Sequence, residues 1–177
     1  MEINIVPVHV SNTGLLNNII NDLRKIFVCP VNLLSLQVDV DPAYSIERAQ
    51  YFSTQIISIA SQQTENLKDK VLLLTEFDIY IPALTFVFGE AQLKGKHSIV
   101  SVCRLHEEFY LGKTDEKLLL KRVTKEVLHE LGHNFGLLHC SDWDCVMHSS
   151  LGIEEVDIKG QSYCYNCKEM ISEYKIL

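Results

Sequence analysis

Two histidines spaced four residues apart, His129 and His133, are the side chains of this sequence best suited to chemistry. On an α-helix they would lie about 40° apart around the axis and about 6 Å apart along it. Both imidazoles can then reach one metal ion at the ~2.0–2.1 Å of a zinc–nitrogen bond. Such a pair can also be incidental on a helix surface, but the residues that follow favour a metal site.

His139 is the third candidate ligand and comes ten residues after His129. A continuous helix would carry it roughly 15 Å further along the axis and onto a different face. It can join the other two histidines only where the helix ends and the chain turns back. Gly136 permits this, because glycine readily adopts the positive φ that commonly ends a helix. The sequence therefore predicts a helix end near Gly136 and a site with three imidazoles.

Three neutral imidazoles with a fourth position left open are typical of a catalytic zinc. Such an ion lowers the pKa of its water to ~7 and polarises a carbonyl group. Glu130 directly follows the first histidine, so it can take the proton of that water and pass it to a leaving amine. Glu126 could orient a ligand, but we expect it to form a surface ion pair with Arg122, four residues earlier.

The cysteines near the C-terminus predict a second metal site. Cys164 and Cys167 have the spacing of a zinc knuckle, and Cys140 with Cys145 offers a second pair. The C-terminal segment is too short to build a core of its own. Segments of that size usually need a disulfide or a structural metal ion for stability. One zinc held by all four thiolates would tie down the loop after His139. Two disulfides are the alternative.

The composition is that of one soluble globular domain. The chain has 177 residues, of which 47% are hydrophobic and 22% charged, and this excludes a disordered protein. The net charge of −7 argues against nucleic acid as a partner. The sequence contains neither a membrane-spanning stretch nor a signal peptide pattern. We therefore expect a cytoplasmic monomer, in a compartment where clustered cysteines more often bind metal than pair. Two further cysteines, Cys29 and Cys103, lie in apolar runs and are expected to be buried and inert.

Apolar patterns indicate the elements that must position these residues. Helical patterns cover about 12–28 and 45–61. The strand-like patterns cover 2–9, 31–40, 71–74, 85–89 and 99–102. This order predicts an α/β layer (α+β in some schemes) whose first half is mostly parallel. Pro82 and Gly89 bracket the fourth strand, which suits the edge of the sheet.

A long helix that begins near Asp115 is predicted to carry the first two histidines. One of its faces is apolar and faces the sheet, with Leu120, Val127, Leu131 and Phe135. The histidines fall on the opposite face. The helix would therefore pack against the sheet and present its imidazoles on the other side.

The motif from His129 to His139 resembles the signature of the metzincin clan of zinc metallopeptidases, in which a methionine turn follows. More narrowly, the chain resembles the archaemetzincins, in which the third histidine is followed by a fixed pattern of cysteines and one methionine. Here these residues are Cys140, Cys145, Met147, Cys164 and Cys167. The segments 86–91 and 101–105 also resemble segments of this family, so the resemblance covers most of the chain.

The resemblance implies a metzincin-like fold: a twisted mixed sheet of about five strands with backing helices, an active-site helix and a small zinc-stapled C-terminal subdomain. The 177 residues would form one catalytic domain. Its N-terminal subdomain would cover about 1–136 and its C-terminal subdomain about 137–177.

The resemblance also implies two zinc ions per chain. The catalytic ion would bind His129, His133 and His139, with Glu130 as the general base. The structural ion would bind Cys140, Cys145, Cys164 and Cys167, and Met147 would form the methionine turn beneath the catalytic site.

The resemblance further implies a cleft in which an extended peptide adds to the edge strand by β-augmentation. The candidate substrate-binding residues are Phe86, Val87, Phe88, Gly89 and Glu90. For Glu90, the favoured interpretation is a solvent-facing edge charge that prevents aggregation.

The sequence thus predicts a zinc metallopeptidase that cleaves peptide bonds with a zinc-activated water and Glu130 as general base. Its partners would be peptide or protein substrates, with neither nucleic acid nor membrane. The alternative is a zinc-stabilised peptide- or protein-binding protein with little or no turnover, against which the retained Glu130 argues. Hydrolysis of a non-peptide bond is also compatible with these ligands.

Overall fold

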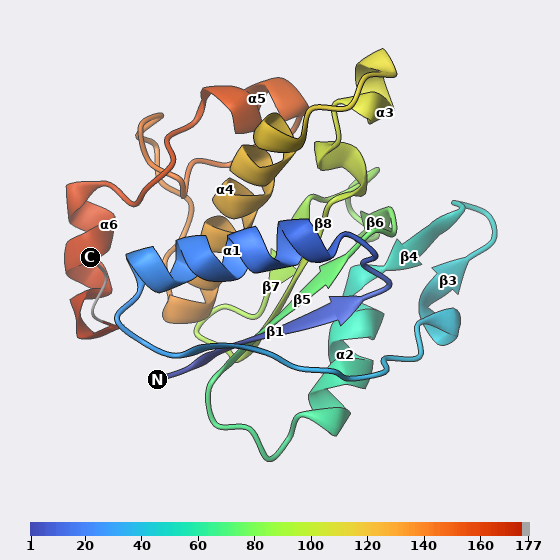
Figure 1. The fold of residues 1–177 in the computed structure, drawn as a ribbon, viewed down its shortest axis with the longest axis horizontal. Coiled ribbons are helices and arrows are strands. Elements are labelled where there is room, and N and C mark those ends of the chain that lie inside the picture. Colours follow the sequence, from blue (N-terminus) through green and yellow to red (C-terminus); the bar gives the residue numbers. More distant parts are fainter. Residues whose placement is uncertain (175–177) are drawn as a thin grey trace.

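Five strands form the main sheet in the order β2–β1–β5–β8–β7. Figure 1 shows β1 and β5 side by side in this sheet. Four of them run parallel, and β7 at one edge is antiparallel to β8. The computed structural model describes residues 1–174. The strands are β1 (Ile3–Val8), β2 (Val31–Leu33), β5 (Lys70–Thr75), β7 (Gly89–Ala91) and β8 (His97–Ser101). The predicted mixed α/β sheet is confirmed, and β7, which overlaps the fourth predicted strand at Gly89, lies at its edge.

Helices cover both faces of the sheet. Leu72 and Leu74 of β5 belong to the core beneath α1 (Thr13–Ile26) and α4 (Glu116–Phe135). The alternate residues Val71 and Leu73 belong to the core beneath α2 (Ser53–Gln63). Successive side chains of a strand point to opposite faces, so a strand buried on both faces reads as a continuous apolar run.

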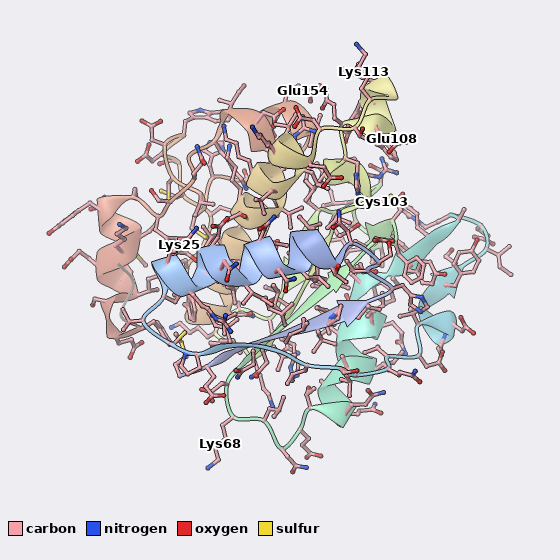
Figure 2. The ribbon with its side chains drawn as sticks, in the orientation of Figure 1. Lys25, Lys68, Cys103, Glu108, Lys113 and Glu154 are labelled. Atoms are coloured by element: carbon pink, nitrogen blue, oxygen red, sulfur yellow. The ribbon has the colours of Figure 1, made fainter. Side chains whose placement is uncertain are left out.

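Charged side chains lie on the outer surface of the molecule. Side chains such as Lys25 on α1 and Lys68 before β5 extend into solvent (Figure 2). No helix within residues 1–174 combines the length and apolar character needed to cross a bilayer.

Shorter elements complete the fold around this core. A second sheet has the order β3–β4–β6. Its strands are β3 (Tyr44–Ser45), β4 (Gln50–Phe52) and β6 (Ile79–Tyr80). The short helices are α3 (Glu108–Leu111), α5 (Ile153–Ile158) and α6 (Tyr165–Met170). Three 3-10 turns span Asp41–Ala43, Cys103–Leu105 and Ser172–Tyr174.

The second predicted helix, over 45–61, is wrong in its first half, because α2 begins only at Ser53. Ala49 has a φ of 52°, which a helix cannot accommodate. Tyr51 stacks on Phe77, with ring centroids 4.2 Å apart, and β4 pairs with β6. Aromatic packing between distant segments therefore overrides the local helical periodicity.

Two predicted strands are displaced. The 31–40 strand ends at Leu33, after which Val38 and Val40 are buried against the α2 core without joining the sheet. The 85–89 strand is shifted, because β7 begins at Gly89. The carbonyl of Thr85 instead accepts a hydrogen bond from Arg48 at 3.0 Å.

Candidate active site and metal centres

The helix α4 that carries the first two histidines has defined ends. At its start, the Asp115 side chain accepts a hydrogen bond from the backbone N–H of Leu118 at 2.9 Å. At its end, Gly136 adopts a φ of 104°, and the N–H of Leu137 returns to the carbonyl of Gly132 at 2.9 Å. This left-handed glycine reverses the chain, as predicted.

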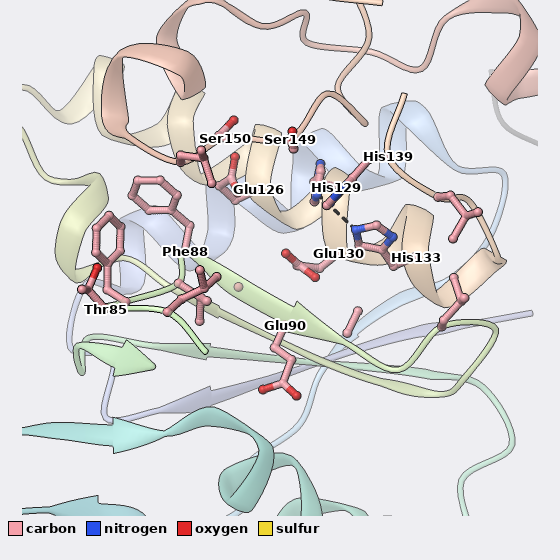
Figure 3. Close-up of a pocket in the computed structure, with 18 residues that line it drawn as sticks. Thr85, Phe88, Glu90, Glu126, His129, Glu130, His133, His139, Ser149 and Ser150 are labelled. Carbon is pink, nitrogen blue, oxygen red and sulfur yellow. Dashed lines mark hydrogen bonds between the residues drawn. The ribbon is translucent and has the colours of Figure 1, made fainter. Parts of the chain in front are cut away.

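The reversal brings His139 back to His129 and His133 (Figure 3). One ring nitrogen from each histidine lies within 4.8 Å of the others. The Nε2 atoms of His129 and His133 are 3.1 Å apart. Nitrogens bound tetrahedrally to one ion at ~2.0–2.1 Å would be about 3.3 Å apart, so the donor set fits a zinc ion.

Backbone carbonyls fix the orientation of the first two imidazoles. The Nδ1 of His129 donates to the carbonyl of Val146 at 2.9 Å, and the Nδ1 of His133 donates to the carbonyl of Leu137 at 2.8 Å. Because Nδ1 carries the proton in each ring, Nε2 presents its lone pair to the metal site.

Burial favours the metal-binding form of these rings. It lowers the pKa of His129 well below its usual range, and the nearby Lys159 adds to this effect. Burial also lowers the pKa of His133 and of His139. All three imidazoles are therefore neutral near pH 7, which is the state that ligates metal.

Glu130 lies in a cavity of about 590 Å³ that the three histidines also line. Its side chain points into the space between α4 and the edge strand (Figure 3). Burial raises the pKa of this carboxyl group well above its usual range, and the charge of Glu126 raises it further. A carboxyl group with a raised pKa can take up and release a proton near neutral pH.

Met147 is fully buried beneath the helix that carries the histidines. A Cβ on Gly132 would lie 2.3 Å from its Sδ atom, so only glycine lets the methionine approach α4 this closely. The carbonyl of Met147 also accepts a hydrogen bond from the N–H of Cys140 at 3.0 Å. The methionine segment thus supports both the helix and the chain after His139.

The four C-terminal cysteines form a second cluster, and their Sγ atoms all lie within 4.8 Å of one another. The Sγ atoms of Cys140 and Cys164 are 4.0 Å apart, and those of Cys145 and Cys167 are 3.7 Å apart. A disulfide needs about 2.05 Å, whereas four sulfurs bound to one zinc at ~2.3 Å are about 3.8 Å apart. The cluster therefore fits a shared zinc ion.

The environment of Glu126 differs from the prediction. Glu126 is buried and pairs with Lys159 at 2.8 Å, whereas Arg122 pairs with Glu107 and Asp157. The cause is that the residue after α5 folds back onto α4, which places a fully buried ammonium group beside Glu126. No sequence pattern indicated that Lys159 would be buried here, because a single lysine after a short helix is normally exposed.

The five candidate residues from Phe86 to Glu90 all line the cavity. The carboxylate of Glu90, however, points away from the histidines (Figure 3). It accepts hydrogen bonds from Ser53 and, at 2.7 Å, from Thr54, both at the start of α2. The cavity also includes residues that no sequence pattern indicated, among them Leu138, Ser149 and Leu151.

The other two cysteines, Cys29 and Cys103, are half-buried rather than fully buried. Burial raises the pKa of both thiols, so they are poor nucleophiles, as expected.

Comparison with known proteins agrees with this geometry. Residues 3–173 match the model described as Peptidase family M54. The archaemetzincin of Methanocaldococcus jannaschii is 41% identical over 131 residues, 74% of this chain and 71% of the relative. That of Natronomonas pharaonis is 34% identical over 174 residues, 97% of this chain and 99% of the relative.

Among solved structures, the archaemetzincin of Archaeoglobus fulgidus, complexed with malonate, is 37% identical to this chain. The match has a TM-score of 0.84 and covers 97% of this chain and 100% of that one. The family model spans residues 3–173, a range that includes the three histidines and the four cysteines. The chain therefore belongs to Peptidase family M54, and it is a zinc metallopeptidase related to the archaemetzincins.

Proposed function

We propose that His129, His133 and His139 hold the catalytic zinc and that Glu130 is the general base for peptide-bond hydrolysis. The observation that carries this proposal is the convergence of three imidazole nitrogens beside a buried carboxyl group. When bound, the zinc would lower the pKa of a water molecule to ~7 and polarise the scissile carbonyl.

The task of Glu130 is proton transfer. Its carboxylate takes a proton from the attacking water, holds it on a carboxyl oxygen and donates it to the nitrogen of the leaving amine. The raised pKa of Glu130 stabilises the protonated form between these two transfers. The carboxyl group is unprotonated again when the amine departs.

The edge strand β7 is proposed to bind the substrate backbone. Ser101 donates its N–H to the carbonyl of Phe88, and Gln92 donates to that of His97. In an antiparallel pair these bonds alternate, so the backbone groups of Gly89 and Ala91 face away from β8. An extended peptide lying in the cavity can pair with them, which is β-augmentation.

A second, structural zinc is proposed for Cys140, Cys145, Cys164 and Cys167, giving two ions per chain. Because Cys140 directly follows His139, this ion would restrain the direction of the third imidazole. The chain would be one metzincin-like catalytic domain, with a subdomain over about 1–136 and a zinc-stapled subdomain over about 137–177, and with Met147 as the methionine turn.

We also propose that the protein is cytoplasmic, because a site of four thiolates is stable in a reducing compartment. We further propose that it acts as a monomer. Cell fractionation and analytical ultracentrifugation test these proposals. Recovery in an oxidising compartment, or a stable dimer at micromolar concentration, would contradict the first or the second proposal, respectively.

The decisive experiment compares Glu130→Gln with the wild type on a diverse peptide library. Zinc content should be equal, and the variant should cleave about 10²–10⁴-fold more slowly because it lacks the base. Glu154→Gln, at an exposed carboxylate, is the matched control and should cleave normally. Equal cleavage by Glu130→Gln would exclude the base role. Peptide binding without cleavage by any form would favour the alternative, a binding protein with little turnover.

A further inference from the structure

The backbone of the edge strand lies in direct contact with Glu130. A Cβ built on Gly89 would be 2.6 Å from Oε1, 2.7 Å from Cγ and 2.8 Å from Cδ of Glu130. Real Cβ atoms essentially never come within 3.0 Å of such neighbours. The Glu130 side chain therefore occupies the space that a side chain at position 89 would need.

The backbone conformation gives no other reason for glycine at this position. Within residues 1–174, the glycines with positive φ are Gly112 and Gly136. Gly89 adopts the extended conformation of β7, which any L-residue can adopt. The need for glycine thus comes from close packing against Glu130.

The edge strand has little freedom to move away from Glu130. On one side, Glu90 accepts hydrogen bonds from Ser53 and Thr54 at the start of α2. Beyond the strand, the N–H of Lys94 donates to the carbonyl of His133 at 2.9 Å. The strand is therefore attached to α2 and to α4, so an added Cβ would displace the Glu130 side chain.

We propose that Gly89 is a positioning residue for peptide hydrolysis. Its missing side chain sets the place of the Glu130 carboxyl group and lets the strand shield that group from water. The inference rests on the proposed base role of Glu130. It adds that a residue of the substrate-binding strand determines where the base sits, so that the peptide and the base are aligned by the same backbone.

A double-mutant cycle, read out by melting temperature, tests the contact between Gly89 and Glu130 without relying on activity. Gly89→Ala should lower the melting temperature by about 3–10 °C, as expected for overpacking in a chain of this size. In a Glu130→Ala background, the same change should cost less than about 1 °C, because the competing side chain has gone. Gly14→Ala, at a remote exposed glycine in α1, should shift the melting temperature by the same amount in both backgrounds. An equal loss in both backgrounds would overturn the inference, as would failure of both Gly89→Ala proteins to fold.

Kinetics test the positioning role. Gly89→Ala should retain wild-type zinc content and affinity, lose at least about tenfold in kcat, and change KM by less than about twofold. The loss should not add to that of Glu130→Ala, which lacks all three of the Glu130 atoms that a Cβ at position 89 would meet. Wild-type kcat in Gly89→Ala, or additive losses, would contradict the inference. If Glu130→Gln cleaved normally, the base role would fail, while the thermal cycle would still decide whether Gly89 positions Glu130.

Discussion

The ammonium group of Lys159 lies 2.8 Å from the carboxylate of Glu126, and both side chains are buried beside the first histidine of the metal site. The same nitrogen is 3.4 Å from Nδ1 of His129. This pair joins the segment after α5 to the face of α4 that carries the site. A buried charge that loses its partner is costly, so the pair has a direct test.

Lys159→Met should reduce the free energy of unfolding by about 3–5 kcal/mol, because it leaves the Glu126 carboxylate buried and unpaired. Adding Glu126→Leu should recover much of that loss. Lys25→Met, which removes an exposed pair with Asp22, should cost less than about 1 kcal/mol. Urea unfolding measures all of these values. A loss no larger for Lys159→Met than for Lys25→Met would show that the buried pair is unimportant.

Cys164→Ser should reduce the zinc content from two ions per chain to one or fewer, because the cluster loses a thiolate. It should also weaken zinc binding at the histidines, since Cys140 directly follows His139. Cys103→Ser is the matched control and should retain both ions. Metal analysis after exhaustive dialysis measures the content. Two ions in Cys164→Ser, or a single ion in fully loaded wild type, would contradict the two-site proposal.

The burial of His97 should make the stability of the protein depend on pH. Burial, and then the charge of Lys96, lowers the pKa of His97 to about 4 in the folded chain, against 6.5 when it is free. The folded state thus favours the neutral ring. The contribution of the neutral His97 ring to the free energy of unfolding is complete above pH 6.5 and is lost as the pH falls toward 4.

The melting temperature of the wild type should therefore fall more between pH 7.5 and pH 5 than that of His97→Gln, by about 2–6 °C. His9→Gln, at an exposed histidine, should keep the wild-type pH dependence. The comparison between variants removes the effect of acid on metal binding, which all three proteins share. Parallel curves for the wild type and His97→Gln would contradict the prediction.

The walls of the cavity predict a preference for apolar substrates. Leu84, Phe86, Phe88 and Leu151 line it beside the histidines. Peptides with a large apolar residue next to the scissile bond should be cleaved at least about tenfold better than those with glycine there, as measured by kcat/KM. Leu151→Asn should narrow this difference, and Val28→Asn, at an exposed residue that does not line this cavity, should not. An unchanged preference in Leu151→Asn would exclude this wall as a determinant.

Much of the fold could be predicted because periodicity reports burial. The continuous apolar run of β5 and the amphipathic pattern of α1 were interpreted correctly, since each depends on which faces are covered. The helix over 45–61 was wrong where Tyr51 stacks on Phe77, because a contact between distant segments leaves no local pattern. Strand limits near Leu33 and Gly89 likewise depend on which partner a segment finds.

The sequence by itself determined the chemistry of the site. The spacing of His129 and His133, the helix-ending Gly136 and the paired cysteines act over a few residues, where helix geometry and chain reversal dictate which atoms can meet. Only the tertiary structure decided that Lys159 faces Glu126, that Met147 packs against Gly132 and that Gly89 touches Glu130. Each of these contacts joins segments that lie far apart along the chain. They form because close packing of the sheet, α4 and the C-terminal segment leaves one arrangement of these side chains, and no local pattern encodes that choice.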